Sequence, residues 1–134
     1  MAKIYKEYEL QKQVCKWLSI QYPKILFMSD TIASCKLTMG QAVRNKAIQK
    51  EAFKTPDLII FEPKGGYHGL FIELKIESPF LKSNPYAFKK NEHIESQAET
   101  MKQLVYKGYR CSFSWTFDQT KDIIENYLNE TKPF

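Results

Sequence analysis

The sequence predicts a single α/β domain in which a central mixed β-sheet carries helices on both faces. Segments with the 3.6-residue apolar period of a helix alternate with short apolar runs typical of buried strands. Their order is helix, strand, helix, strand, strand, helix, strand, helix. The 134 residues suffice for one domain with a real core and are too few for two, so residues 1–134 are interpreted as one unit.

The first helix is predicted over residues 5–22, where apolar side chains recur at three- and four-residue spacing before Pro23 ends the segment. Glu7 and Gln11 extend the same stripe, whereas Glu9 lies on another face. The apolar residues of the stripe are Leu10, Val14, Trp17 and Leu18.

A short buried strand is predicted over residues 25–29 and is followed by a segment that is harder to interpret. Residues 38–53 have helical spacing of their apolar positions but carry many basic residues on their flanks, so this segment is interpreted as helical or partly mobile. Its basic residues could contact phosphates or serve as a solvated face. The candidates for nucleic-acid binding are Arg44, Lys46, Lys50 and Lys54.

Two strong strand patterns, over residues 57–61 and 69–76, predict a β-hairpin, because the segment between them holds Gly65 and Gly66. Beyond them, residues 78–90 form a long polar and aromatic connection. Connections of this length in a compact domain are often functional, so this one is a candidate contact with substrate.

The register of this hairpin decides which charged side chains meet. If its loop has an odd number of residues centred on Gly65, Asp57 lies directly opposite Glu73, and the two-residue period of a strand places Lys75 on the same face. An even-numbered loop would break this arrangement. The reverse face then pairs apolar residues, Leu58 with Ile72 and Ile60 with Leu70.

The last part of the chain predicts a helix, a strand and a helix. The first helix covers residues 94–107 and ends at Gly108, a usual residue for a helix C-terminus. Residues 109–117 alternate as a strand, and Asp118 is the predicted N-cap of the final helix.

Composition narrows the class of partner. The chain is 43% hydrophobic and 26% charged, the balance of a folded protein. Lys and Arg number 20 against 15 Asp and Glu, and the net charge of +5 suits a polyanion. Only Arg44 and Arg110 are arginines, the side chain that most often reads base edges, so contacts with phosphates rather than with specific bases are expected.

Cysteine usage and hydropathy indicate the compartment. Cys15, Cys35 and Cys111 lie far apart with no CxxC pair, so neither a disulfide framework nor a zinc site is indicated. No apolar run approaches the ~20 residues of a membrane span. We expect an intracellular, cytoplasmic protein in a reducing environment, with no membrane partner and no small organic cofactor.

The predicted meeting of Asp57, Glu73 and Lys75 suggests metal-assisted chemistry on phosphate esters. Two carboxylates facing each other across a strand pair can share a hard divalent cation such as Mg²⁺ or Mn²⁺, which also relieves their mutual repulsion. Such a cation polarises a phosphodiester and lowers the pKa of a bound water, while a neighbouring ammonium stabilises the growing negative charge.

Asp57, Glu73 and Lys75 at this spacing resemble the signature of the PD-(D/E)xK nuclease superfamily, and the wider pattern resembles its VRR-NUC family. The resemblance runs through nearly the whole chain in the right order. The motifs that carry it are Glu7-Tyr8-Glu9-Leu10-Gln11, Thr55-Pro56-Asp57-Leu58-Ile59-Ile60, Gly69-Leu70-Phe71-Ile72-Glu73-Leu74-Lys75, and Gln97 followed by Leu104 and Gly108-Tyr109.

The resemblance implies the PD-(D/E)xK, or restriction-endonuclease-like, fold and a Mg²⁺- or Mn²⁺-dependent DNA endonuclease acting on branched or flapped DNA. Small standalone members, many of them viral, tend to be homodimers that resemble Holliday junction resolvases. It implies a metal site of Glu7, Asp57, Glu73 and the Leu74 main-chain carbonyl, with Lys75 as the catalytic lysine and Gln97 as a polar residue completing the site.

The residues leave some alternatives open. Glu9 competes with Glu7 as the acid of the first helix, and Glu77 could join the metal shell or be a rim charge. The chain also departs from the family where members commonly carry glycines before the Pro-Asp pair, since it has Glu51-Ala52-Phe53-Lys54-Thr55 there. This difference concerns the approach of substrate more than metal binding.

Two other functions fit the same residues. One is a catalytically idle DNA-junction-binding module that keeps the fold and the charge, and the other is a nuclease acting on RNA. His68 and His93 are assigned no role, because single histidines near a hairpin loop and a helix start are more often structural or solvent-facing.

Overall fold

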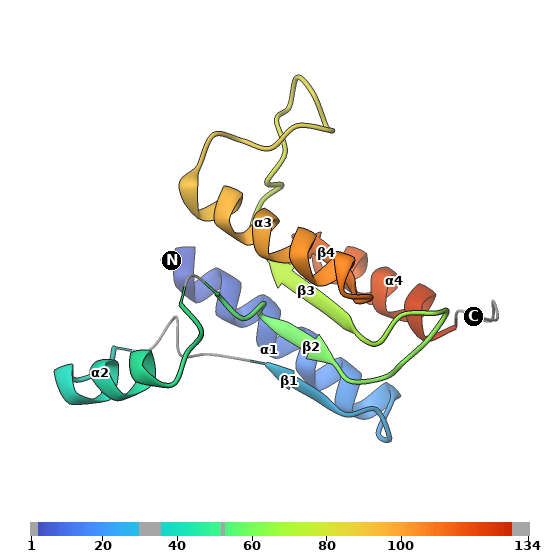
Figure 1. The fold of residues 1–134 in the computed structure, drawn as a ribbon. Helices are drawn as coiled ribbons and strands as arrows, with labels where there is room; N and C mark the ends of the chain where they lie inside the picture. The colour runs from blue at the N-terminus through green and yellow to red at the C-terminus, as the bar shows by residue number, and fades with distance from the viewer. Residues whose placement is uncertain (1–2, 30–35, 52, 130–134) are drawn as a thin grey trace.

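The computed structural model describes residues 3–29, 36–51 and 53–129, with the side chains of residues 3–5 left out. Figure 1 shows the elements in chain order. They are α1 (Lys3–Gln21), β1 (Phe27–Ser29), α2 (Met39–Ala47), β2 (Leu58–Ile60), β3 (Leu70–Leu74), α3 (Glu92–Tyr106), β4 (Arg110–Ser114) and α4 (Phe117–Leu128).

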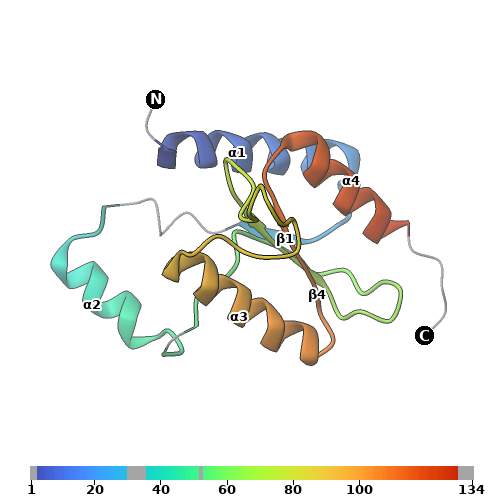
Figure 2. The ribbon, with the colours of Figure 1, turned by 90° about the horizontal axis from the view of Figure 1, so that it is seen from above.

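The four strands form one mixed sheet in the order β1-β2-β3-β4. The β1–β2 and β2–β3 pairs are antiparallel, and the β3–β4 pair is parallel because α3 carries the chain back between them. Figure 2 shows α1 and α4 on one side of the sheet and α3 on the other. The predicted mixed sheet with helices on both faces is confirmed.

The hydrophobic core lies between the sheet and the α1–α4 pair. The strands pair Leu58 with Ile72 and Ile60 with Leu70, which is the predicted register, and these four side chains are completely buried. The core is completed from the two helices by Val14, Leu18, Ile124, Tyr127 and Leu128.

The β2–β3 connection combines a tight glycine turn with a strand register centred on Gly65. Gly65 and Gly66 have φ of 56° and 90°, a region that residues with a Cβ rarely occupy. Lys64 and Tyr67 flank them and exchange two backbone hydrogen bonds of 3.1 and 2.8 Å. The pairing of Lys64 with Tyr67 is offset by one residue from the pairing of Leu58 with Ile72, so the connection takes up one extra residue between the turn and the strands. The strand register, and not the turn, therefore places the position before β2 opposite Glu73 of β3.

Helix α2 stands apart from the body in both ribbon views (Figures 1 and 2). Thr38 begins it with a capping box, in which its hydroxyl accepts from the Gln41 N–H at 3.2 Å and its own N–H donates to the Gln41 side chain at 2.9 Å. None of its residues is buried, and Met39 and Val43 are 85% and 64% exposed. The helix ends at Ala47, earlier than the periodicity over residues 38–53 suggests.

The start of α4 corrects one prediction. Its N-cap is Thr116, whose hydroxyl accepts a 3.1 Å hydrogen bond from the Gln119 N–H, and Asp118 lies in the first turn. The prediction of Asp118 as the cap was wrong because the helix begins at Phe117, where the ring packs edge-on against Trp17. An acid in the first turn still interacts favourably with the helix dipole.

None of the helices in the described ranges is long and apolar enough to cross a membrane.

Candidate active site

A cavity of about 600 Å³ opens at the edge of the sheet where β2 begins and β3 ends. Its lining comes from α1, from the end of α2 and the segment after it, from the residues directly before β2, from the end of β3 and the segment after it, and from α3. The walls include every residue that the sequence analysis assigned to catalysis or metal binding. These residues are Glu7, Asp57, Glu73, Leu74, Lys75 and Gln97.

The centre of the cavity is the pair of carboxyl groups on Asp57 and Glu73. Continuing the β2–β3 register by one position places these two residues opposite each other, as predicted. The Asp57 Oδ2 accepts a 2.8 Å hydrogen bond from the Leu74 N–H, which fixes the direction of that carboxyl group. Glu73 is only 5% exposed.

Burial makes the charged form of Glu73 costly. Desolvation, followed by the charge of Asp57 and a hydrogen bond between the two carboxyl groups, raises the pKa of Glu73 to about 10. Lys75 opposes this shift and Glu7 adds to it. At neutral pH the pair therefore holds one proton, which a bound cation would replace.

The backbone of Asp57 is fixed from the side of α1 and β1. The Ser29 hydroxyl donates to the Asp57 carbonyl at 2.7 Å, and the Gln11 side-chain amide donates to the same carbonyl at 3.4 Å and to the Ser29 hydroxyl. Gln11 was placed on the stripe of Glu7 from the sequence, but its contact with the Pro-Asp strand was not foreseen. It follows from the position of Gln11 one helical turn after Glu7.

The two acids of the first helix lie on different surfaces. Glu7 is half-buried, lines the cavity and acts electrostatically on Glu73. Glu9 lies on an outer surface of α1 beside Lys6 and Lys12. Of the two candidates, the structure brings Glu7 to the site.

Lys75 lines the cavity directly after β3, on the face of Glu73. Its N–H donates to the Ser114 carbonyl at 2.8 Å and continues the parallel pairing with β4, so its backbone is held as firmly as the strand. Glu77 lies at the rim of the cavity, where its 65%-exposed side chain forms a 3.8 Å ion pair with Lys89.

A polar chain on α3 faces the acids from the opposite wall. Gln97 is 6% exposed, and its Nε2 lies 3.2 Å from the His93 Nε2. The His93 Nδ1 lies 3.5 Å from the Lys54 Nζ. A neutral imidazole has one acceptor nitrogen, so His93 accepts from one of these two donors at a time.

His93 is a residue of the cavity that the sequence analysis did not assign. Burial, then the charges of Lys75 and Lys54, lower the pKa of His93, so its neutral form is favoured. The signal was available, because residues four apart on a helix share a face and Gln97 was already a site candidate. Asn91 begins α3 and accepts from the His93 N–H at 2.9 Å, which fixes this first turn.

The oxygen donors of the cavity fit a hard divalent cation. Asp57, Glu73 and the Leu74 carbonyl are the ligand types that Mg²⁺ and Mn²⁺ prefer. The buried Gln97 Oε1 has no hydrogen-bond partner among the described residues, and a ligand or its bound water would supply one. No three His, Cys, Asp or Glu side chains in the described ranges lie close enough together to hold a metal by themselves.

The four basic candidates for nucleic-acid contact lie in different places relative to the cavity. Lys54 lines the cavity, and Arg44 and Lys46 lie in the exposed last turn of α2. Lys50 is exposed in the segment between them. Of these four residues, the structure therefore brings only Lys54 into the lining of the cavity.

Comparison with known proteins shows a likeness in fold. No protein-family model and no curated protein matches the chain. A solved structure described as a "VRR_NUC domain protein" superposes on 94% of this chain and 90% of its own with a TM-score of 0.63, at 23% sequence identity. The predicted resemblance is thereby confirmed at the level of the fold: the mixed sheet and its flanking helices are arranged as in that VRR_NUC domain protein.

Proposed function

We propose that the protein is a divalent-metal-dependent DNA endonuclease that hydrolyses phosphodiester bonds, with Mg²⁺ or Mn²⁺ as cofactor and branched or flapped DNA as substrate. The observation that carries the proposal is the Asp57–Glu73 pair, in which the buried carboxyl group of Glu73 meets the half-buried carboxyl group of Asp57 beside Lys75. Burying a carboxyl pair without a cation costs free energy of folding. Such a pair therefore indicates a bound cation or a catalytic role. The likeness to a VRR_NUC domain protein supports the same class of activity.

Each side chain has a distinct task in this proposal. Asp57, Glu73 and the Leu74 carbonyl hold the cation, with Glu7 completing the shell from α1. The bound cation supplies polarisation of the scissile phosphate and a water of lowered pKa. Lys75 orients the attacking water and stabilises negative charge on the phosphate, and Gln97 fixes a ligand or water of the site through its amide.

Lys54 and the exposed basic residues of α2 hold the phosphates that flank the cut. Lysine binds phosphate as a point charge without reading sequence, which agrees with selection of a DNA structure rather than a DNA sequence. A four-way junction presents two symmetric strands to cut, whereas one domain has one site, so we propose that a homodimer is the working form. Light scattering of the purified protein tests this oligomeric state.

The decisive experiment is cleavage of labelled four-way junction, flap and plain duplex DNA with Mn²⁺, Mg²⁺ or EDTA. The Lys75→Ala variant is expected to lose about a hundredfold or more of the metal-dependent cleavage, because the cation alone cannot replace its ammonium. Lys107→Ala, at the other end of α3, is the matched control and should cleave like the wild type. Unchanged cleavage by folded Lys75→Ala protein would contradict the proposed role.

A catalytically idle junction-binding module is the competing function. Addition of Mn²⁺ should raise the unfolding temperature of the wild type by mass action and that of the Asp57→Asn variant much less. Binding of junction DNA without cleavage and without stabilisation by Mn²⁺ would favour the idle module. Cleavage of an RNA substrate under the same conditions tests the choice of nucleic acid.

A further inference from the structure

The connection between β3 and α3 is a built projection, here called the arm, which comprises residues 78–90. Phe80 and Phe88 face each other in an antiparallel bridge. The Leu81 N–H donates to the Ala87 carbonyl and the Lys89 N–H to the Pro79 carbonyl, each at 2.8 Å. Figure 1 shows this segment standing out from the body above α3. The arm is therefore a small hairpin with its own hydrogen bonds.

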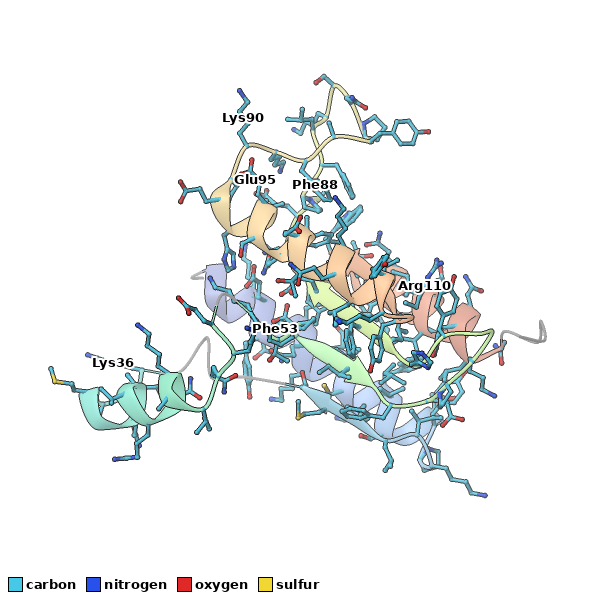
Figure 3. All side chains as sticks on the ribbon, in the orientation of Figure 1. Lys36, Phe53, Phe88, Lys90, Glu95 and Arg110 are labelled. Atoms are coloured by element: carbon cyan, nitrogen blue, oxygen red, sulfur yellow. The ribbon has the colours of Figure 1, made fainter. Side chains whose placement is uncertain are left out.

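The foot of the arm is fixed by aromatic packing. The rings of Phe80 and Phe88 stack with their centroids 4.8 Å apart. Phe80 meets Trp115 edge-on at 6.0 Å, and Phe88 meets Phe113 at 5.6 Å. Phe113 belongs to β4 and Trp115 directly follows it. These contacts therefore fix the position of the arm relative to the sheet. Figure 3 shows Phe88 at this foot.

The tip of the arm presents an aromatic side chain to solvent. Residues Asn84 to Ala87 form a turn closed by a 3.1 Å hydrogen bond from the Ala87 N–H to the Asn84 carbonyl. The Asn84 Oδ1 accepts a further 3.0 Å bond from the Tyr86 N–H, and Pro85 restricts the backbone of the turn. Tyr86 is 93% exposed on this ordered tip.

The charge and position of the arm suit a polyanion. Residues 78–90 contain three lysines and no acid. Lys89, with Ser78 and Pro79, also lines the cavity of the carboxyl pair, and Figure 3 shows Lys90 directed away from the body. The same nucleic acid that enters the cavity would therefore pass the arm.

We infer that the arm is a second DNA contact, in which Tyr86 stacks on an unpaired base of the substrate while its lysines contact the neighbouring phosphates. The inference rests on the proposed function for the identity of the nucleic acid as DNA. Stacking on an aromatic side chain requires a base free of its neighbours, such as those at a flap or a branch point. Because the turn already holds Tyr86 outward, little conformational entropy is lost when a base binds.

The test measures binding without cleavage. Fluorescence anisotropy in EDTA compares a flap with unpaired bases and a fully paired duplex of equal length. Tyr86→Ala is expected to weaken binding of the flap about tenfold and binding of the duplex by less than about twofold. Tyr86→Phe keeps the ring and should bind like the wild type. Tyr106→Ala is the matched control, because Tyr106 is also 93% exposed but lies at the far end of α3.

The outcomes separate this inference from the proposed nuclease activity. Equal binding of the flap by Tyr86→Ala and wild-type protein overturns the inference, even if cleavage depends on metal and on Lys75. An equal loss on flap and duplex also overturns it, since stacking on unpaired bases would not then be involved. Selective loss on the flap supports it, and absence of cleavage in the parallel assay would then contradict the proposed activity alone.

Discussion

At the scale of single residues, Glu73 carries the largest electrostatic cost in the described chain. Its pKa is raised from 4.5 to about 10 in the folded protein. Between these values the unfolded chain has released a proton that the folded chain still holds, so the stability of the metal-free protein falls as the pH rises above about 4.5. Stability from this source is fully present at lower pH and lost toward pH 10.

Replacement of this acid by its amide gives a direct test. Glu73→Gln keeps the size of the side chain and a hydrogen-bond donor toward Asp57, and it removes the titration. In EDTA at pH 8 we expect its unfolding temperature to exceed that of the wild type by about 5 °C or more, with a flatter pH profile. Thermal unfolding between pH 5 and 9 measures this, with exposed Glu99→Gln as control. If the unfolding temperature of Glu73→Gln fell with pH as steeply as that of the wild type, the titration could not be assigned to Glu73.

The side chain of Gln97 has a different destabilising feature, a buried oxygen without a hydrogen-bond partner among the residues that the structure describes. Gln97→Leu removes that unpaired group at nearly constant volume, so the unfolding free energy should stay within about 1 kcal/mol of the wild type or increase. Metal-dependent cleavage should fall at least about tenfold. Chemical denaturation and the cleavage assay together check the two effects, and a large loss of stability would show that the amide is structural.

At the scale of elements, two helices have a threonine N-cap but differ in whether they pack against the hydrophobic core. Thr116 caps α4, which contributes Ile124 and Tyr127 to the core, whereas Thr38 caps the unburied helix α2. Loss of a threonine cap costs about 1 kcal/mol. Thr116→Ala should therefore lower the unfolding temperature by about 4 °C, and Thr38→Ala should leave it within about 1 °C.

The Thr38→Ala change should instead appear locally. Amide hydrogen exchange in α2 is expected to accelerate about fivefold, since a cap is worth about 1 kcal/mol and the helix opens independently of the core. Exchange in α4 serves as the internal reference. An equal drop in unfolding temperature for both variants would mean that α2 is coupled to the body.

The β2–β3 hairpin was predictable from the sequence, and its register was predicted on the condition that the loop has an odd number of residues. The glycine pair indicates the hairpin, and the apolar alternation selects the register, because a shift by one position would turn Leu58 and Ile72 out of the core. The observed pairing of Leu58 with Ile72 satisfies the condition and brings Asp57 opposite Glu73. The helix starts were less predictable. Thr116 and Asp118 are both good caps, and only the packing of Phe117 on the first helix decides between them.

At the scale of the whole molecule, the net charge of +5 should make DNA binding strongly dependent on salt. Lys50→Ala and Lys54→Ala are each expected to weaken binding of every DNA structure by a similar factor and to reduce the slope of log K against log salt by about one. Anisotropy titrations in EDTA from low to moderate salt measure both quantities. An unchanged slope in both variants would move the phosphate contacts to another surface.

The fold and the acidic centre could be predicted from the sequence, whereas the surroundings of the centre could not. Local periodicity gives the helices and strands, and the family resemblance gives their order around the sheet. The detachment of α2, the contact of His93 with Lys54 and the direction of the arm depend on long-range packing, which periodicity does not encode. Trp115 and Phe113, which hold the arm, lie in residues 109–117, whose alternation predicts a strand but not which loop the rings will contact.

The unequal lengths of the two antiparallel connections bear on the order of folding. The β2–β3 hairpin closes a short loop around Gly65, whereas β1 and β2 can pair only after the chain has closed over the excursion that contains α2. Loop closure becomes costlier with length, so we expect the β2–β3 hairpin to form first. High φ-values at Leu58 and Ile72 with low values at Phe27 would show this order.

The two carboxyl groups would then be brought face to face in the earliest β-structure, while water still solvates both. Their mutual repulsion would grow only as α3 closes over them and expels that water. Nascent chains that meet a divalent cation at this stage would finish folding with the charge already neutralised, so we expect refolding to be faster in Mg²⁺ than in EDTA.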